Sequence, residues 1–241
     1  MTISGPDLTA DLHTHSDLTD GADSPEAMAA GAGRAGLSVW GLSDHVRAST
    51  DWLPDYVPRV RALRVDGLQV RCGVEAKILD ISGRLDMPPG AFDLDYILVA
   101  DHQFPGHDGP VDPREVRAWV GDGQRSATEL VDDLVAATVR AVETNPFPTI
   151  LAHLFSVLPK CGLDESEVTD EHLRSLGAAL ARHDAAVEAN EKWRCPSWRV
   201  LESLAGMGVR LTAGSDAHRV EDIGQWDYAD HTATVSAGSR A

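Results

Sequence analysis

Two pairs of metal-ligand side chains, one near each end of the 241-residue chain, constrain the fold most strongly. An apolar approach at residues 8–12 leads into His13 and His15, and a second approach at 209–214 leads into Asp216 and His218. Both approaches are typical of β-strands, in which residues i and i+2 face the same side. Each pair therefore presents two ligand-type side chains together, as a metal ion requires. A site that uses both pairs must be assembled by the whole fold.

Apolar runs that alternate with amphipathic stretches recur between these two pairs. The runs at 37–43, 68–74, 94–100, 148–152 and 185–189 are typical of buried strands. Helix patterns at 127–143, 170–182 and 198–205 separate several of them, and a further helix is predicted to start at Ser24 and Pro25 and to end at Gly36. Repeated strand–helix units indicate a parallel sheet.

A histidine, acid or amide follows one predicted strand after another. In α/β barrels the carboxyl ends of the strands carry the active site. Polar residues also mark ordinary strand ends, but that reading explains poorly why ligand-type residues recur at so many of them. Beyond the two pairs, the residues at these positions are His45, Glu75, His102, His153 and Asn190.

The composition indicates a globular protein with one domain, which we assign to residues 1–223. The polar, aperiodic segment 224–241 is interpreted as a C-terminal tail that is either disordered or covers part of the domain. No apolar stretch is long enough to span a bilayer and no signal-peptide pattern is present, so we expect a cytoplasmic protein without a membrane partner. Three widely spaced cysteines support neither a disulfide framework nor a Cys-based zinc site.

The ordered series of motifs resembles the polymerase and histidinol phosphatase superfamily, called PHP, from residue 11 to residue 218. No single motif is specific, but their order and their placement at strand ends are. The matching segments are 11–15, 19–21, 42–45, 73–75, 100–102, 152–153, 188–190 and 214–218.

The resemblance implies a distorted (β/α)7 barrel with a trinuclear metal centre at the carboxyl ends of its strands. It assigns the ligands in three sets, with Glu75 bridging the first two: His13, His15, Glu75 and Asp216; Glu75, His102 and His153; and Asp20, His45 and His218. The residue chemistry agrees independently, because imidazole and carboxylate without thiolate suit Zn²⁺, Mn²⁺ or Fe²⁺ and do not choose among them. We expect two or three such ions.

Such a centre favours an anionic substrate. Two or three divalent ions outweigh the carboxylates of Glu75, Asp20 and Asp216, and phosphate fits the resulting positive charge. We therefore expect a metal-dependent phosphoesterase that hydrolyses a small-molecule phosphate monoester, as histidinol phosphatases do, by attack of a metal-bound hydroxide. The resemblance gives Glu75, His13, His15 and Asp216 the role of holding that hydroxide. A serine triad has no support, because no GxSxG segment is present.

Three alternatives remain open at this stage. The first is a phosphodiesterase or exonuclease that acts on nucleotides or short oligonucleotides. The formal net charge of −17 argues against long nucleic acids but not against small nucleotides. The other two are an amidohydrolase-like hydrolase and a non-catalytic metal-binding PHP module. The sequence does not encode the natural substrate, the metal or the oligomeric state.

Five residues are candidates for substrate binding. Lys192 and Arg194 occupy a loop after a predicted strand where, by resemblance, a basic residue binds phosphate. Arg219 directly follows His218. Lys77 lies two residues past Glu75 and shares its face if the strand continues. Asn190 is the fifth, as a residue that orients a ligand or substrate by hydrogen bonds.

Overall fold

Seven parallel strands form one sheet in the computed structural model, which describes residues 5–231. The spatial order of the strands, β1-β2-β3-β4-β7-β8-β9, follows the chain. A sheet of this kind needs a crossover between successive parallel strands. The strands are β1 (Ala10–Asp11), β2 (Val39–Leu42), β3 (Gln69–Lys77), β4 (Tyr96–Ala100), β7 (Thr149–Ala152), β8 (Ala186–Asn190) and β9 (Arg210–Gly214).

The first and last strands meet and nearly close the sheet into a barrel. Just beyond β1 and β9, the His15 amide donates to the Ala217 carbonyl at 2.9 Å. The carboxylate of Asp11, which is fully buried, accepts hydrogen bonds from the amides of Ser215 and Gly224 at 3.0 and 3.1 Å. The architecture is the distorted (β/α)7 barrel that the sequence predicts.

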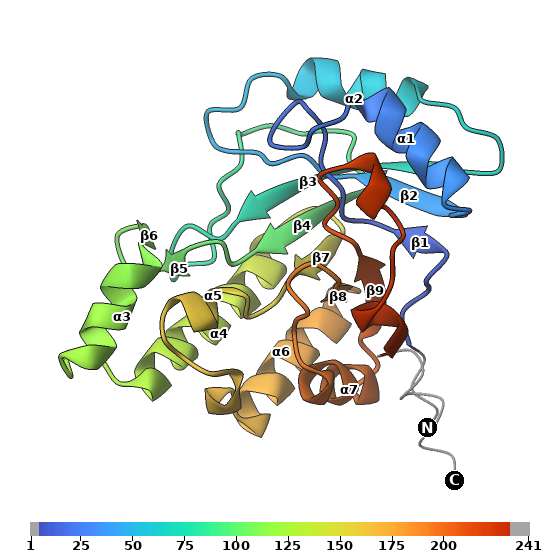
Figure 1. Cartoon of the computed structure of the whole chain (residues 1–241). Helices are drawn as coiled ribbons and strands as arrows, with labels where there is room; N and C mark the ends of the chain where they lie inside the picture. The colour runs from blue at the N-terminus through green and yellow to red at the C-terminus, as the bar shows by residue number, and fades with distance from the viewer. Residues whose placement is uncertain (1–4, 232–241) are drawn as a thin grey trace, which may run out of the picture.

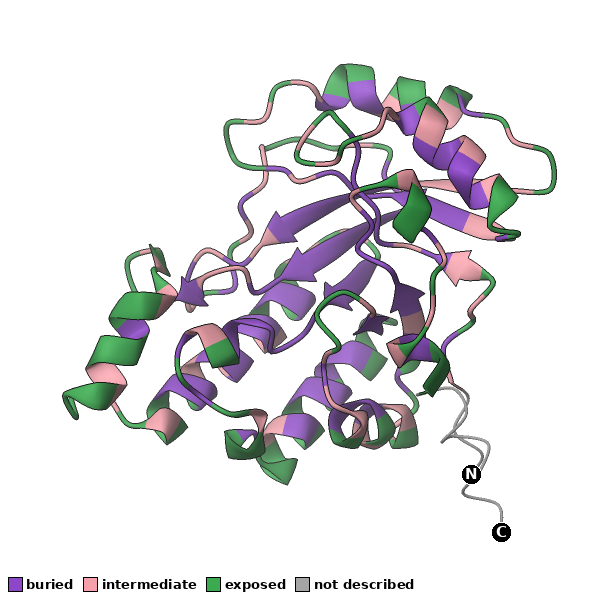
Figure 2. Cartoon of the chain, in the orientation of Figure 1, coloured by how far each residue is buried: buried purple, intermediate pink, exposed green. Residues whose placement is uncertain are grey.

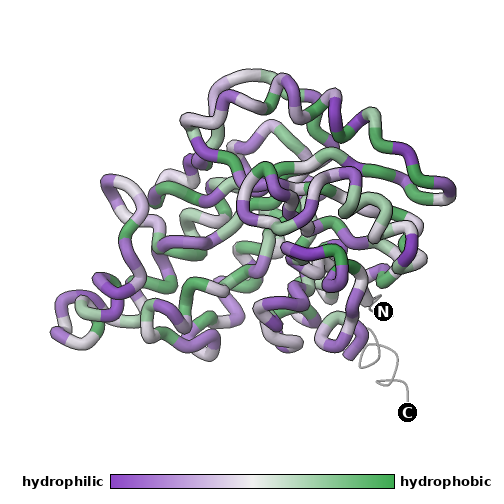
Figure 3. The backbone as a smooth tube through the Cα atoms, turned by 45° about the horizontal axis from the view of Figure 1, so that its top comes forward, coloured by the Kyte–Doolittle hydropathy of each residue, from purple (hydrophilic) through white to green (hydrophobic). Residues whose placement is uncertain are grey.

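Helices surround the sheet on its outside. Figure 1 shows α1 and α2 over one part of the barrel, with α4, α6 and α7 below it. Figure 2 shows buried strands surrounded by helices whose outer faces are exposed. Figure 3 shows hydrophobic residues mostly on the inner segments and hydrophilic residues mostly on the outer ones. The helices are α1 (Pro25–Arg34), α2 (Leu53–Ala62), α3 (Pro113–Gly121), α4 (Ala127–Thr144), α5 (Val157–Lys160), α6 (Asp170–Arg182) and α7 (Trp198–Gly206).

Local chemistry explains several of the helix ends. The Ser24 hydroxyl accepts the Ala27 amide at 3.3 Å and caps α1, as the sequence predicts. Gly36 follows that helix with φ of 77°, a conformation that glycine adopts without steric cost. Ser126 and Glu129 form a reciprocal capping box at the start of α4.

A small apolar cluster fills the interior of the barrel below the strand ends. Tyr96 is its largest side chain, and its hydroxyl donates to the Leu12 carbonyl at 2.7 Å. Gly41 on β2 and Gly73 on β3 make room for the Tyr96 ring, because a Cβ atom at either position would overlap it. The ring thus ties the segment after β1 to the neighbouring strands and supports the polar residues above.

Some elements differ from the sequence-based expectation. Helices α2 and α3 were not predicted, and a short hairpin of β5 (Phe104–Pro105) and β6 (Pro110–Val111) occupies a segment that reads as a loop. Strand β3 continues past 68–74 as far as Lys77, whereas β1 is shorter than the run at 8–12. Within the described residues, no helix is both long and apolar enough to cross a membrane.

The described part of the predicted tail, residues 224–231, contacts the domain. The Trp226 indole donates to the Leu8 carbonyl at 2.9 Å, and the Glu191 carboxylate accepts the amides of Tyr228 and Ala229 at 2.9 and 3.0 Å. The rest of the tail, 232–241, lies outside the described residues. The boundary at 223 and 224 stays a prediction.

Candidate metal centre

All nine predicted ligands come together at the carboxyl ends of the strands. Glu75 lies on β3 itself, and the others follow β1, β2, β4, β7 and β9 within the loops. Their ligand atoms form four overlapping groups: His13, His15 and Glu75; His13, His153 and Asp216; His45, Glu75 and His102; and His15, Asp20, His45 and His218.

Glu75 lies between two pairs of histidines. Its Oε1 atom is 2.9 Å from Nε2 of both His102 and His153. Its Oε2 atom is 3.5 Å from Nε2 of both His13 and His15. The side chain is only 1% exposed. Each carboxylate oxygen therefore faces a different pair of these imidazoles, and Oε2 also lies 2.8 Å from Nδ1 of His45. A carboxylate that bridges two ions needs an arrangement of this kind.

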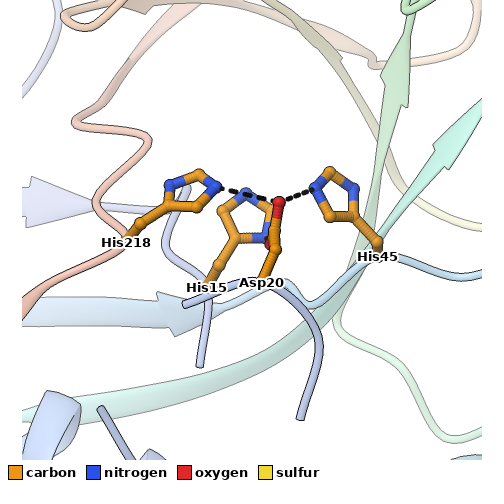
Figure 4. A group of neighbouring side chains, drawn as sticks. All are labelled: His15, Asp20, His45 and His218. Atoms are coloured by element: carbon orange, nitrogen blue, oxygen red, sulfur yellow. Dashed lines mark ion pairs between the residues drawn. The ribbon is translucent and has the colours of Figure 1, made fainter. Parts of the chain in front are cut away.

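Asp20 forms the centre of a more open group. Its Oδ2 atom is 3.3 Å from Nε2 of both His45 and His218. Figure 4 shows these two imidazoles on either side of the carboxylate, with His15 beside it. Asp20 is 53% exposed, whereas His15 is fully buried. This group therefore lies at the entrance of the site and the group around Glu75 lies at its floor.

The groups overlap more than the three predicted sets do. His15, predicted for the first ion, also lies in the group around Asp20. The Nδ1 atom of His45, predicted for the third ion, is 2.8 Å from Oε2 of Glu75. Neighbouring ions at such a site would therefore lie close together and share ligands at their boundary.

The donor set fits divalent cations. The Nδ1 atom of His15 is buried and has no hydrogen-bond partner among the described residues, which is costly unless a ligand satisfies it. The Nε2 atoms of His13 and His15 are 3.0 Å apart and both face Glu75. Imidazole nitrogens and carboxylate oxygens that converge in this way are the ligands of Zn²⁺, Mn²⁺ and Fe²⁺.

The charges of these groups depend strongly on one another. Burial alone would raise the pKa of Glu75, but His102 and His13 lower it well below its usual range. Burial alone would lower the pKa of His13, but Glu188 and Asp216 raise it well above its usual range. The pKa of His15 is lowered well below its usual range, mainly by burial. The floor of the site thus holds a carboxylate in its ionised form.

A buried carboxylate that the sequence analysis left without a role supports two ligands. Glu188 on β8 is 1% exposed, and its Oε1 atom is 2.8 Å from Nδ1 of His13. Its Oε2 atom accepts the His153 amide at 2.7 Å. A carboxylate on the far nitrogen of a histidine fixes its tautomer and ring orientation. In the sequence, Glu188 was indicated only by its place in the segment 188–190, which matches the PHP motifs but to which the resemblance assigned no role for Glu188.

Asp101 supports His153 in a similar way. Its Oδ1 atom is 3.4 Å from Nδ1 of His153 and accepts the Ser156 hydroxyl at 2.8 Å. The same hydroxyl is 3.0 Å from His153 Nδ1. In the sequence, Asp101 is visible only as the residue before His102.

A cavity of about 350 Å³ opens above the ligands. Lys77 and Lys192, two of the five substrate-binding candidates, line it. Lys192 Nζ is 3.1 Å from both Asp216 Oδ1 and His218 Nδ1. Lys77 shares the face of Glu75 because β3 continues, as the prediction required. Arg47 and Gln103 also line the cavity and were not predicted.

The other three candidates lie elsewhere. Arg194 points to Asp227 on the exposed surface, at 2.8 Å, and Arg219 is exposed near Glu221. Asn190 is fully buried, and its amide donates to Glu188 at 3.0 Å. The structure thus places Asn190 behind the ligands, where it supports Glu188, and not on the cavity wall.

The model of the PHP domain family matches residues 11–141, more than half of the chain. The chain belongs to the PHP domain family. A probable phosphatase of Caldanaerobacter subterraneus subsp. tengcongensis is 26% identical to this PHP-domain protein over 230 residues, which cover 92% of this chain and 81% of the relative. A probable phosphatase of Acetivibrio thermocellus is 27% identical over 228 residues, covering 91% and 83%.

The solved structures agree on the fold. The histidinol phosphate phosphatase of Lactococcus lactis subsp. lactis, solved with zinc, L-histidinol and phosphate, superposes with a TM-score of 0.64. It is 18% identical, and the match covers 95% of this chain and 92% of that one. Together with the phosphatase relatives, the family membership makes this PHP-domain protein a metal-dependent phosphoric ester hydrolase.

Proposed function

We propose that this PHP-domain protein hydrolyses small-molecule phosphate monoesters with two or three divalent ions held by the nine ligands. The observation that carries the proposal is Glu75, whose two oxygens face separate histidine pairs on the floor of a cavity. The predicted sets assign the ions to three neighbouring positions. Zn²⁺, Mn²⁺ and Fe²⁺ all suit these ligands.

The charge of the site supports an anionic substrate. The ligands include the three carboxylates of Asp20, Glu75 and Asp216, and two or three divalent ions more than neutralise them. When bound, such ions activate water as a nucleophile near neutral pH and polarise phosphoryl oxygens.

The chain's own residues then position the reactants. Lys192, at 3.1 Å from a ligand carboxylate and 43% exposed, stands where the ligand cluster meets the cavity. We assign it to a phosphoryl oxygen, since an ammonium group stabilises negative charge that develops there. Glu188 and Asp101 hold His13 and His153 in the orientation that metal binding requires.

The size of the cavity supports a small monoester. Its volume of about 350 Å³ lies near the lower end of the range of ligand pockets, roughly 300–1,000 Å³. Histidinol phosphate belongs in the test panel because the Lactococcus enzyme is named for it. The likeness to that enzyme concerns the fold, so the alcohol part of the substrate is a separate question.

A nucleotide phosphodiesterase is the second candidate, and Trp193 is the observation that favours it. This side chain lines the cavity and is 45% exposed, with Lys160 Nζ 4.2 Å from its ring centroid. An exposed indole at a cavity rim can stack on a nucleobase.

Turnover of a substrate panel tests the proposal. Protein reconstituted with Mn²⁺ or Zn²⁺ is assayed with phosphate monoesters, including histidinol phosphate, and with diesters and short oligonucleotides. We expect monoester turnover that is lost in His13→Ala. Turnover of diesters alone would move the assignment to the second candidate. Full metal loading without any phosphoester turnover would overturn both.

A further inference from the structure

One wall of the cavity is built from hydrogen-bond donors. Arg47 follows the ligand His45 by two residues, and Gln103 directly follows the ligand His102. Lys77 lies at the end of β3, two residues beyond Glu75. All three line the cavity that the ligands also line. This donor wall, Arg47, Lys77 and Gln103, is therefore adjacent to the metal centre without belonging to it.

The contacts within the wall leave several of its donors without a partner among the described residues. Lys77 Nζ donates to Gln103 Oε1 at 2.8 Å. That bond uses the acceptor of the Gln103 amide and leaves its NH₂ group as a donor. No hydrogen bond or ion pair engages the Arg47 guanidinium within the described residues. The three side chains together offer donors and almost no free acceptor.

The wall also carries an excess of positive charge. Asp86 is the carboxylate that lines the cavity beside it, and its Oδ2 atom is 3.6 Å from Lys77 Nζ. The other oxygen of Asp86 accepts the Ala48 amide at 2.7 Å. Asp86 therefore offsets the charge of Lys77 and leaves the charge of Arg47 without a carboxylate partner among the described residues. Arg47 thus adds a positive charge beside the proposed site that no described carboxylate pairs with, in a chain whose formal net charge is −17. Such a charge indicates an anionic ligand.

The wall is suited to one chemical group. Lys77 is only 14% exposed, so its ammonium has little water around it and gains from an anionic partner. The planar guanidinium of Arg47 can bind a carboxylate or phosphate through two parallel hydrogen bonds. The phosphate that is hydrolysed is assigned to the metal ligands and Lys192, so the donor wall is available for another part of the substrate.

We propose that the donor wall binds a second anionic group, a carboxylate or a phosphate, on the leaving group of the phosphate ester. This rests on the proposed phosphomonoesterase function and defines its substrate class. An alcohol that carries an anion is then preferred, and an alcohol that carries an ammonium group, as histidinol does, is disfavoured. Arg47 is the specificity-determining residue.

Four two-carbon phosphomonoesters isolate the effect of that group. Their leaving groups differ: that of phosphoglycolate carries a carboxylate, that of ethane-1,2-diol bisphosphate a second phosphate, that of ethyl phosphate no charged group and that of phosphoethanolamine an ammonium group. With the Mn²⁺-loaded enzyme we expect kcat/KM for the best anionic substrate to exceed that for ethyl phosphate by about tenfold or more, with phosphoethanolamine lowest. Whichever anionic ester is better identifies the group as carboxylate or phosphate.

Arg47→Glu tests the residue, with Arg174→Glu on the exposed face of α6 as the matched control. In Arg47→Glu, at unchanged metal content, we expect KM to rise much more for the two esters whose leaving group carries an anion than for ethyl phosphate. Arg174→Glu should match the wild type. Equal kcat/KM in the wild type for esters with anionic and with uncharged leaving groups, or an equal loss for every ester in Arg47→Glu, would overturn the proposal.

A binding measurement keeps the two proposals distinguishable. The non-hydrolysable analogues 3-phosphonopropionate and propylphosphonate differ only in the carboxylate, and calorimetry on the holoenzyme needs no turnover. Tighter binding of 3-phosphonopropionate that is lost in Arg47→Glu supports the donor wall, even if no monoester is hydrolysed. Equal affinities would exclude it, even if monoester hydrolysis is fast.

Discussion

At the scale of single residues, carboxylates behind the ligands determine how the histidines are oriented. Glu188 contacts the Nδ1 atom of His13 and the amide of His153, and Asn190 donates to the same carboxylate. The Nε2 atom of His13 is left free to face Glu75. When the proton of a neutral His13 is on Nδ1, held by Glu188, the lone pair of Nε2 points toward the position of a metal ion.

Glu188→Gln should therefore weaken metal binding without unfolding the protein. The amide is close in size but cannot serve both contacts as an acceptor, and one buried donor loses its partner. We expect metal affinity to fall by about 10- to 100-fold. Titration with a metal-sensitive dye measures it, and Glu202→Gln on the exposed surface is the matched control. Unchanged affinity would mean that Glu188 does not position His13.

Protons compete with metal at the same residues. Burial alone would lower the pKa of His153, but Asp101 and Glu75 raise it to about 10 in the metal-free protein. A histidine must lose its proton to bind a metal ion. Metal affinity should therefore fall as the pH is lowered from 10, and loading at pH 8 should release about one proton from this group.

Proton release on adding Zn²⁺ or Mn²⁺ at pH 8, followed in weakly buffered solution, checks this expectation. His153→Asn should release about one proton fewer than the wild type. If both proteins release the same number of protons, His153 is not protonated before metal binds.

At the scale of elements, the strands and the apolar cluster around Tyr96 inside the barrel position the candidate ligands. Glycines on β2 and β3 admit the Tyr96 ring, whose hydroxyl reaches the Leu12 carbonyl next to His13. Helix α2 braces the same strands from outside, because the Tyr56 hydroxyl donates to the carbonyls of Leu42 and Gly73 at 3.0 and 2.8 Å.

Gly73→Ala should destabilise the barrel and disturb the site above it. The added methyl group overlaps the Tyr96 ring, which is buried, and overpacking of a buried core typically costs ~1–3 kcal/mol. Chemical denaturation measures the free energy of unfolding. Gly121→Ala, where the added atom meets open space, is the control. A Gly73→Ala variant as stable as the control would show that the barrel interior is loosely packed.

Sequence patterns predicted the strands, and the residues that the structure brings together at their ends, better than the walls of the cavity. Strand ends carry the candidate ligands at regular positions, so His45, Glu75 and His153 could be placed at the site from the order of motifs alone. Helix α2 was missed because Pro54 and Pro58 interrupt its pattern. Arg47 and Gln103 sit in loops, where the direction of a side chain depends on tertiary packing and not on periodicity.

At the scale of the whole molecule, the proposed metal centre connects segments from the first strand to the last. The nine proposed ligands run from His13 after β1 to His218 after β9, so an ion bound among them would join both edges of the nearly closed sheet. The buried Asp11 carboxylate reinforces the same junction. We therefore expect folding and metal binding to be coupled.

Removal of metal should lower the thermal stability of the whole barrel. An ion present at about 1,000 times its dissociation constant stabilises the folded state by about 4 kcal/mol, because the unfolded chain does not form the site. Differential scanning calorimetry with and without chelator measures the shift. The shift should be smaller in Asp20→Ala, which is expected to lose one ion. A melting temperature that chelator leaves unchanged would contradict the coupling.

The most direct test measures metal content per chain and monoester turnover together in Glu75→Gln. If Glu75 bridges two ions, the amide cannot hold both, so bound metal falls by at least one ion per chain and turnover drops to the level of His13→Ala. A Glu75→Gln variant with the full metal content and wild-type turnover would contradict the central claim.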